Sequence, residues 1–128
     1  MFSHIMVGAN DLEASRAFYD ALFETLGVKP GRRDKDRYFW RSRTGVFGIS
    51  LPIDGQPATH ANGGTIGFAV EDQEQANAWH AAGLANGGTA IEDPPGIRSD
   101  GVSSMYLAYL RDPAGNKICA LKFIPKAD

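Results

Sequence analysis

The chain has 128 residues and a formal net charge of −2, which suits one compact domain or two half-size modules. The near-neutral charge excludes a general attraction to nucleic acid or to anionic membrane. The single cysteine, Cys119, excludes an intrachain disulfide and a multi-cysteine zinc site. The N-terminal segment lacks the regions of a signal peptide, and no apolar run is long enough to cross a membrane, which favours a cytoplasmic protein.

The first half of the chain predicts a strand, a helix and further strands. The helix begins at Asn10 or Asp11, whose side-chain oxygen can cap the first turn. Gly27 is placed to end it in a left-handed conformation. The charged run 32–37 predicts a solvated loop whose charges neutralise one another, and the alternative is a rim that attracts an anionic ligand. The strands predicted in this half cover residues 3–7, 38–41 and 46–51.

The second half repeats this order. Its helix begins at Asp72 and ends at the glycine pair 87–88. Val7 and Val70 are 63 positions apart, whereas Asp11 and Asp72 are 61 apart, which predicts a shorter connection from strand to helix in the second copy. The strands predicted here cover residues 65–70, 104–110 and 117–124.

Turn-forming residues fill the span 52–64 and divide the chain into a first module, residues 1–61, and a second module, residues 62–128. Modules of this size are barely stable alone, so they must share a core or a sheet. Alternation in the first strand puts Ile5 under the helix and His4 on the opposite, concave face. Two such faces would enclose a cavity.

Three segments carry a resemblance to a known family: residues 2–7, residues 11–19 and the closing Leu-Arg-Asp-Pro-Ala-Gly-Asn-Lys-Ile at 110–118. In this order they resemble the vicinal oxygen chelate superfamily, which includes glyoxalase I, bleomycin- and fosfomycin-resistance proteins and extradiol dioxygenases. The resemblance covers essentially the whole chain. It implies an α+β fold in which two tandem βαβββ modules form a curved mixed sheet around a central cavity, and it implies a homodimer.

The superfamily's chemistry normally rests on a divalent metal held by residues of both modules. His4 matches the histidine ligand of the first strand, but Gly67 stands at the equivalent place in the second copy. Cys119 stands where relatives carry glutamate, and the remaining ligand falls near Ser50 or Gly48. Because hard divalent ions need several oxygen or imidazole ligands, we expect no metal and no other cofactor. The alternative is that His4 and Cys119 help to hold a softer ion such as zinc.

Several side chains are candidates for lining the cavity. Tyr109 shares its face with the side that carries Cys119, so its phenol can contact a ligand, although plain packing is an alternative. Phe39 and Trp40 face opposite ways, so one of them lines the cavity and the other lies in the core, and the sequence does not settle which. Residues 92–101 form a loop that could act as a flap carrying Arg98. Cys119 is either an inert buried thiol or a reactive one. The predicted ligand pocket comprises His4, Trp40, Ser50, Gly67, Arg98, Tyr109 and Cys119.

Two classes of function follow from the resemblance. The first is a metal-free protein that binds a small organic molecule in an apolar and aromatic cavity. The second is a metal-dependent lyase, isomerase or dioxygenase in which the ion polarises a substrate oxygen. The residues at positions 67 and 119 favour the first class, because neither is a typical ligand of a hard metal ion.

Overall fold

The computed structural model describes residues 1–125 of the chain. The elements of the first half are β1 (His4–Gly8), α1 (Leu12–Glu24), β2 (Arg32–Asp34), β3 (Arg37–Ser42) and β4 (Gly45–Ser50). Those of the second half are β5 (Ile66–Ala69), α2 (Gln73–Ala85), β6 (Thr89–Ala90), β7 (Gly96–Ser99), β8 (Ser104–Arg111) and β9 (Lys117–Ile124). The last three residues of the predicted second module lie outside the described part of the chain.

Each half of the chain forms its own sheet. The strand order is β1-β4-β3-β2 in the first sheet and β5-β9-β8-β6 in the second, where β7 also pairs with β8. The pairs β1–β4 and β5–β9 are parallel, and the other pairs are antiparallel. The predicted α+β fold class is confirmed. The second half differs in detail, because residues 91–95 leave the sheet and split its second strand into β6 and β7.

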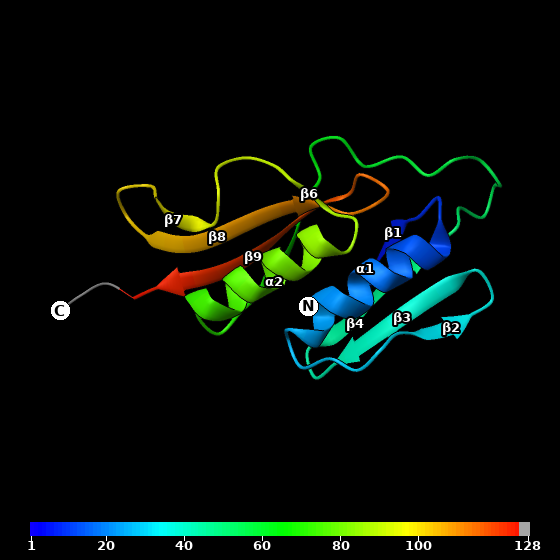
Figure 1. Ribbon diagram of the computed structural model, residues 1–128, viewed down its shortest axis with the longest axis horizontal. Coiled ribbons are helices and arrows are strands. Elements are labelled where there is room, and N and C mark those ends of the chain that lie inside the picture. Colours follow the sequence, from blue (N-terminus) through cyan, green and yellow to red (C-terminus); the bar gives the residue numbers. More distant parts are fainter. Residues whose placement is uncertain (126–128) are drawn as a thin grey trace.

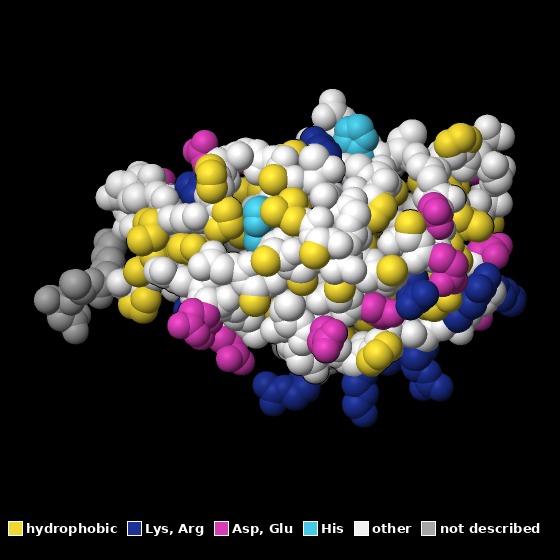
Figure 2. Space-filling view, in the orientation of Figure 1, with side chains coloured by type: hydrophobic (Ala, Val, Ile, Leu, Met, Phe, Trp, Pro, Cys, Tyr) yellow, Lys and Arg dark blue, Asp and Glu magenta, His cyan; other side chains and the backbone are white. Residues whose placement is uncertain are grey.

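The helices α1 and α2 pack against each other on the same side of both sheets (Figure 1). Figure 2 shows the molecule from this helix side. Aromatic side chains of both helices are completely buried, namely Phe18 and Tyr19 of α1 and Trp79 of α2. Between the two sheets, the rings of Phe47 and Phe68 are in contact, with centroids 5.4 Å apart. One continuous core therefore serves both halves of the chain.

No helix covers the opposite faces of the two sheets in the described residues (Figure 1). On this side Phe123 of β9 is 63% exposed, although it is a large apolar residue. We name these surfaces the open faces of the first and second sheets. Within the described residues, no helix therefore closes the space in front of these faces, where the central cavity is expected.

A buried carboxylate joins the two halves at the Asp-Pro-Ala-Gly-Asn turn between β8 and β9. Asp112 is 3% exposed and accepts hydrogen bonds from the Tyr19 hydroxyl at 2.7 Å and from the backbone N–H groups of Ala114 and Asn116 at 2.9 Å. The Asn116 amide donates to Asp112 Oδ2 at 2.8 Å and to the Gly8 carbonyl of β1 at 2.9 Å. The turn therefore connects α1 and β1 to the second sheet.

Local signals determine where the helices begin and end. The Asp11 side chain accepts from the N–H of Ala14 at 3.0 Å, and Asp72 accepts from the N–H of Gln75 at 2.8 Å. These bonds satisfy backbone donors that have no partner inside the helix. Gly27 has a φ of 76°, as predicted for a left-handed stop. Neither helix of the described residues is long and apolar enough to cross a membrane.

Three local predictions are wrong. The first is the shorter connection in the second copy, because three residues separate strand and helix in both copies. The ends of the strands and the starts of the helices are therefore both 61 positions apart, and Met6 rather than His4 corresponds to Gly67. Within the charged run 32–37, β2 pairs with β3, and the turn at Lys35 has a φ of 55°. The predicted flap contains β7, which pairs with β8 along residues 96–99. Backbone pairing outweighs the polar composition in both segments.

Candidate functional site

The site begins with the alternation of side chains in the second sheet. Tyr106, Ala108 and Leu110 of β8 belong to the core beneath α2. Because successive side chains of a strand point to opposite faces, Leu107 and Tyr109 lie on the open face. The same alternation places Cys119 and Leu121 of β9 there, since Ile118 and Ala120 lie in the core.

Three predicted site residues meet in one row across this open face. Cys119 pairs directly with Gly67 of β5 on one side and with Tyr109 of β8 on the other. Gly67 is exposed and Cys119 is 5% exposed. A Cβ atom added at Gly67 would lie 3.3 Å from the Cys119 sulfur, so the glycine leaves open a shallow space that a side chain would fill. The next row pairs Ala69, Leu121 and Leu107 and is apolar.

Charged groups border the row at its Tyr109 end. The Lys117 ammonium lies 5.0 Å from the centroid of the Tyr109 ring and forms an ion pair with Glu92. Burial raises the pKa of the Tyr109 phenol, and the nearby Cys119 and Glu92 add to this effect. Burial also raises the pKa of the Cys119 thiol, so the sulfur is protonated at neutral pH. The row therefore presents a neutral phenol and a neutral thiol.

Sequence reasoning missed Lys117 and Glu92. Lys117 is two positions before Cys119, so alternation alone could have placed it on the same face. Glu92 belongs to the segment that leaves the sheet and has a φ of 59°. No sequence signal indicates where such a segment runs.

The predicted site residues of the first sheet lie at opposite ends of its open face. His4 is exposed at the start of β1 and its Nδ1 lies 2.8 Å from the Ser3 hydroxyl. Ser50 pairs with Gly8, and its hydroxyl donates to the Leu51 carbonyl at 2.7 Å. His4 and Gly8 are four residues apart along one strand, which corresponds to about 13 Å. His4 and Ser50 are therefore not brought together.

Trp40 does not line the open face, and its predicted place in the pocket is wrong. The side chain is 2% exposed in the core, and its indole N–H donates to Asp20 Oδ1 at 2.9 Å. Phe39 occupies the open face instead, in a row with Gly48 and Met6. The reason is the pairing of β3 with β4, which places Trp40 beside Phe47 on the helix side.

Arg98 does not join the row either. It pairs with Met105, four residues along β8 from Tyr109, a separation of about 13 Å along the strand. One terminal nitrogen of its guanidinium donates to the carbonyls of Asp93 and Pro94, at 2.9 and 3.0 Å. Arg98 therefore holds the segment between β6 and β7 against the sheet.

The residues on the open faces do not fit a divalent metal. His4 lies on the first sheet and Cys119 on the second. Among residues 1–125, no three or more His, Cys, Asp or Glu side chains are grouped so that they could hold an ion. We therefore derive no chemical step through a metal for this chain.

The comparisons with known proteins agree with this architecture. A crystal structure of a glyoxalase/bleomycin resistance protein from Albidiferax ferrireducens T118 shares 65% identity with this chain, covers 94% of it and 98% of its own length, and superposes with a TM-score of 0.92. A glyoxalase-related enzyme from Fulvimarina pelagi is 18% identical, with 99% of both chains covered and a TM-score of 0.72.

A lactoylglutathione lyase from Agrobacterium tumefaciens is 19% identical and has a TM-score of 0.63, with 94% of this chain and 92% of that one covered. At this identity the likeness concerns the fold alone. None of the curated proteins matches the chain significantly. The family model of the Glyoxalase/Bleomycin resistance protein/Dioxygenase superfamily matches residues 1–120. The chain belongs to this superfamily.

Proposed function

We propose that this chain binds a small organic molecule on the open face of its second sheet and that it does so without metal chemistry. The observation that carries the proposal is the row of Gly67, Cys119 and Tyr109 beside an apolar row. A surface that combines apolar side chains with a few polar groups is typical of small-molecule sites. In this arrangement the Tyr109 hydroxyl can form a hydrogen bond with the ligand. The apolar part of the ligand then lies on Leu107 and Leu121.

The ion pair of Lys117 with Glu92 favours an uncharged ligand. The carboxylate already offsets the ammonium charge next to Tyr109. An anionic ligand at this place would have to compete with Glu92, and a cationic one with Lys117. A neutral molecule with one hydrogen-bonding group suits the row best.

We also infer that a second copy of the chain covers the open faces. The exposed Phe123 supports this, because large apolar side chains on an uncovered sheet face are typical of interaction surfaces. Sedimentation equilibrium of the wild type is expected to give a dimer mass, and Phe123→Glu is expected to shift the equilibrium toward monomer. A wild type that stays monomeric at all concentrations would contradict this inference.

The binding proposal can be tested with the neutral fluorescent probe N-phenyl-1-naphthylamine. We expect saturable fluorescence enhancement with the wild type and weaker binding by Gly67→Leu, because the new side chain fills the space beside Cys119. Ala81→Leu is the matched control, since it adds the same side chain at an exposed position of α2, in the helix layer. Equal binding by the wild type and Gly67→Leu would refute the location of the site.

The metal-dependent alternative is tested in the same preparation. Titration with Zn²⁺ and Ni²⁺, followed by calorimetry, is expected to show no stoichiometric binding to the wild type. One tightly bound ion per chain that is lost in His4→Ala would overturn the metal-free proposal and would favour an enzyme with a Lewis-acid centre.

A further inference from the structure

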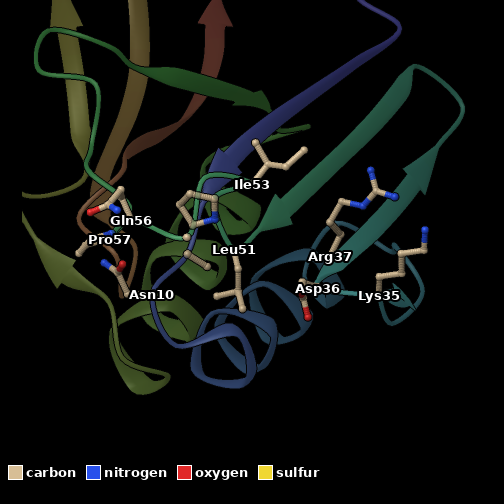
Figure 3. A pocket seen from close by; sticks show the side chains of 11 residues that line it. Asn10, Lys35, Asp36, Arg37, Leu51, Ile53, Gln56 and Pro57 are labelled. Carbon is tan, nitrogen blue, oxygen red and sulfur yellow. The ribbon is translucent and has the colours of Figure 1, made fainter.

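A second site candidate lies on the first sheet, where β1 and β4 end. A cleft of about 720 Å³ opens there, a volume within the range of small-molecule sites. None of the seven predicted pocket residues lines it, so it is separate from the row on the second sheet. Its lining, shown in Figure 3, is Ala9, Asn10, Lys35, Asp36, Arg37, Leu51, Pro52, Ile53, Gly55, Gln56 and Pro57.

Hydrogen bonds hold the walls of this cleft in place. The Asn10 side chain accepts from the N–H of Ala58 at 2.7 Å and donates to the Ala58 carbonyl at 3.2 Å. The N–H of Leu51 donates to the Asp36 carbonyl at 3.0 Å, which joins the segment after β4 to the β2–β3 turn. At Gly8 an added Cβ would lie 2.8 Å from the Ala58 Cβ, so only glycine lets the connection between the halves pass this closely. The cleft is therefore preformed.

One wall of the cleft carries positive charge. Figure 3 shows Lys35 and Arg37 extending in the same direction, whereas the Asp36 carboxylate points the opposite way. Asp34 pairs with Arg37 at 2.7 Å, but within residues 1–125 no carboxylate lies within 4 Å of the Lys35 ammonium. An anionic group would be attracted to this wall.

The facing wall is apolar. Leu51, Pro52, Ile53 and Pro57 line it, and Ile53 is fully exposed to solvent. Covering an exposed isoleucine side chain removes apolar surface from water, which favours binding. A ligand that covers Ile53 while an anionic group reaches Lys35 would therefore use both walls.

We propose that this cleft binds a small molecule in which a carboxylate is joined to an apolar chain or ring. The carboxylate lies at Lys35, because Asp34 already offsets the charge of Arg37, and the apolar part lies on Ile53 and its neighbouring prolines. This site goes beyond the function proposed above, because it uses different residues and the opposite choice of ligand charge.

The test uses 4-phenylbutanoate and its uncharged analogue 4-phenylbutan-1-ol, followed by ¹H–¹⁵N spectra of the full chain. The carboxylate is expected to shift the amide signals of residues 35–37, 51 and 53–56 in a saturable way. Lys35→Gln is expected to weaken binding about five-fold, as is typical of one exposed charge contact. Ile53→Ser is expected to weaken it to a similar degree. Lys29→Gln is the matched control, because it removes the same charge at an exposed position outside the cleft.

Three results would overturn the proposal. They are equal affinity for the alcohol and the carboxylate, signal changes centred on residues of the second sheet, and equal weakening by Lys29→Gln and Lys35→Gln. The last result would indicate a general attraction between charges. Gly67→Leu separates the two proposals, because it is expected to leave carboxylate binding unchanged while it weakens the neutral probe.

Discussion

Replacing Tyr19 by phenylalanine tests the buried link between the halves of the chain. The hydroxyl of this fully buried residue donates to Asp112 Oδ2 at 2.7 Å, and the ring packs edge-on against Phe18 and stacks on Phe23. The substitution keeps the ring and removes only the hydroxyl. A hydrogen bond to a charged group contributes about 1.5–3 kcal/mol, so we expect Tyr19→Phe to lower the free energy of unfolding by about 2 kcal/mol.

The loss stays within this range because three other donors continue to satisfy the Asp112 carboxylate. For a chain of this length, 2 kcal/mol corresponds to a fall in Tm of about 7 °C. Urea unfolding followed by tryptophan fluorescence measures the change, and the slope of the free energy against urea should stay constant.

Tyr106→Phe is the matched control for this prediction. Its hydroxyl also donates at 2.7 Å, but to the neutral amide oxygen of Asn77, and the residue is 8% exposed. A neutral hydrogen bond contributes about 0.5–1.5 kcal/mol. The reasoning would be refuted if Tyr19→Phe destabilised the protein no more than Tyr106→Phe does.

Four further measurements probe the remaining structure. Gly83→Ala should destabilise the protein by about 1–3 kcal/mol despite the better helix propensity of alanine, because the added Cβ would overlap Leu110. Asp72→Ala should cost about 1 kcal/mol in urea unfolding through loss of the α2 cap. Burial lowers the pKa of His80, so the contribution of the neutral imidazole to the free energy of unfolding should be fully present above about pH 6.5 and should be lost as the pH falls through the lowered value. His80→Gln should flatten this pH profile. Burial also raises the pKa of Cys119, so iodoacetamide should label the folded protein slowly and the urea-unfolded protein rapidly.

Each of these predictions has its contradicting result. A more stable Gly83→Ala variant would mean that the helix can move away from the sheet without loss. An unchanged unfolding midpoint in Asp72→Ala would show that other groups satisfy the first turn of α2. The same pH profile in His80→Gln and the wild type would assign the pH dependence to other groups. Rapid labelling of folded Cys119 would mean that the open face admits reagents freely.

Features decided by neighbouring residues could be predicted from the sequence. The caps at Asp11 and Asp72 and the left-handed Gly27 depend on residues within one helical turn. The pairing of Tyr109 with Cys119 follows from alternation on both sides of the tight turn at Asp112, so it too was within reach of the sequence.

Features decided by distant partners could not be predicted. Whether Phe39 or Trp40 faces the helices depends on how β3 pairs with β4, and the sequence of β3 alone does not contain that information. The ion pair of Lys117 with Glu92 depends on the route of a segment outside the sheet. The cleft at Lys35 requires a hairpin in a charged run whose composition favours a loop.

The bond between Tyr19 and Asp112 joins residues 93 positions apart, and this separation has a consequence for synthesis. At about 5–20 residues per second, a ribosome needs roughly 5–20 s to extend the chain from one partner to the other. During that interval the first helix carries a tyrosine hydroxyl whose acceptor does not yet exist, and Phe23 lacks its contact with Phe68 until the second sheet is made. The nascent protein can therefore complete its shared core only when nearly all of the chain has been made.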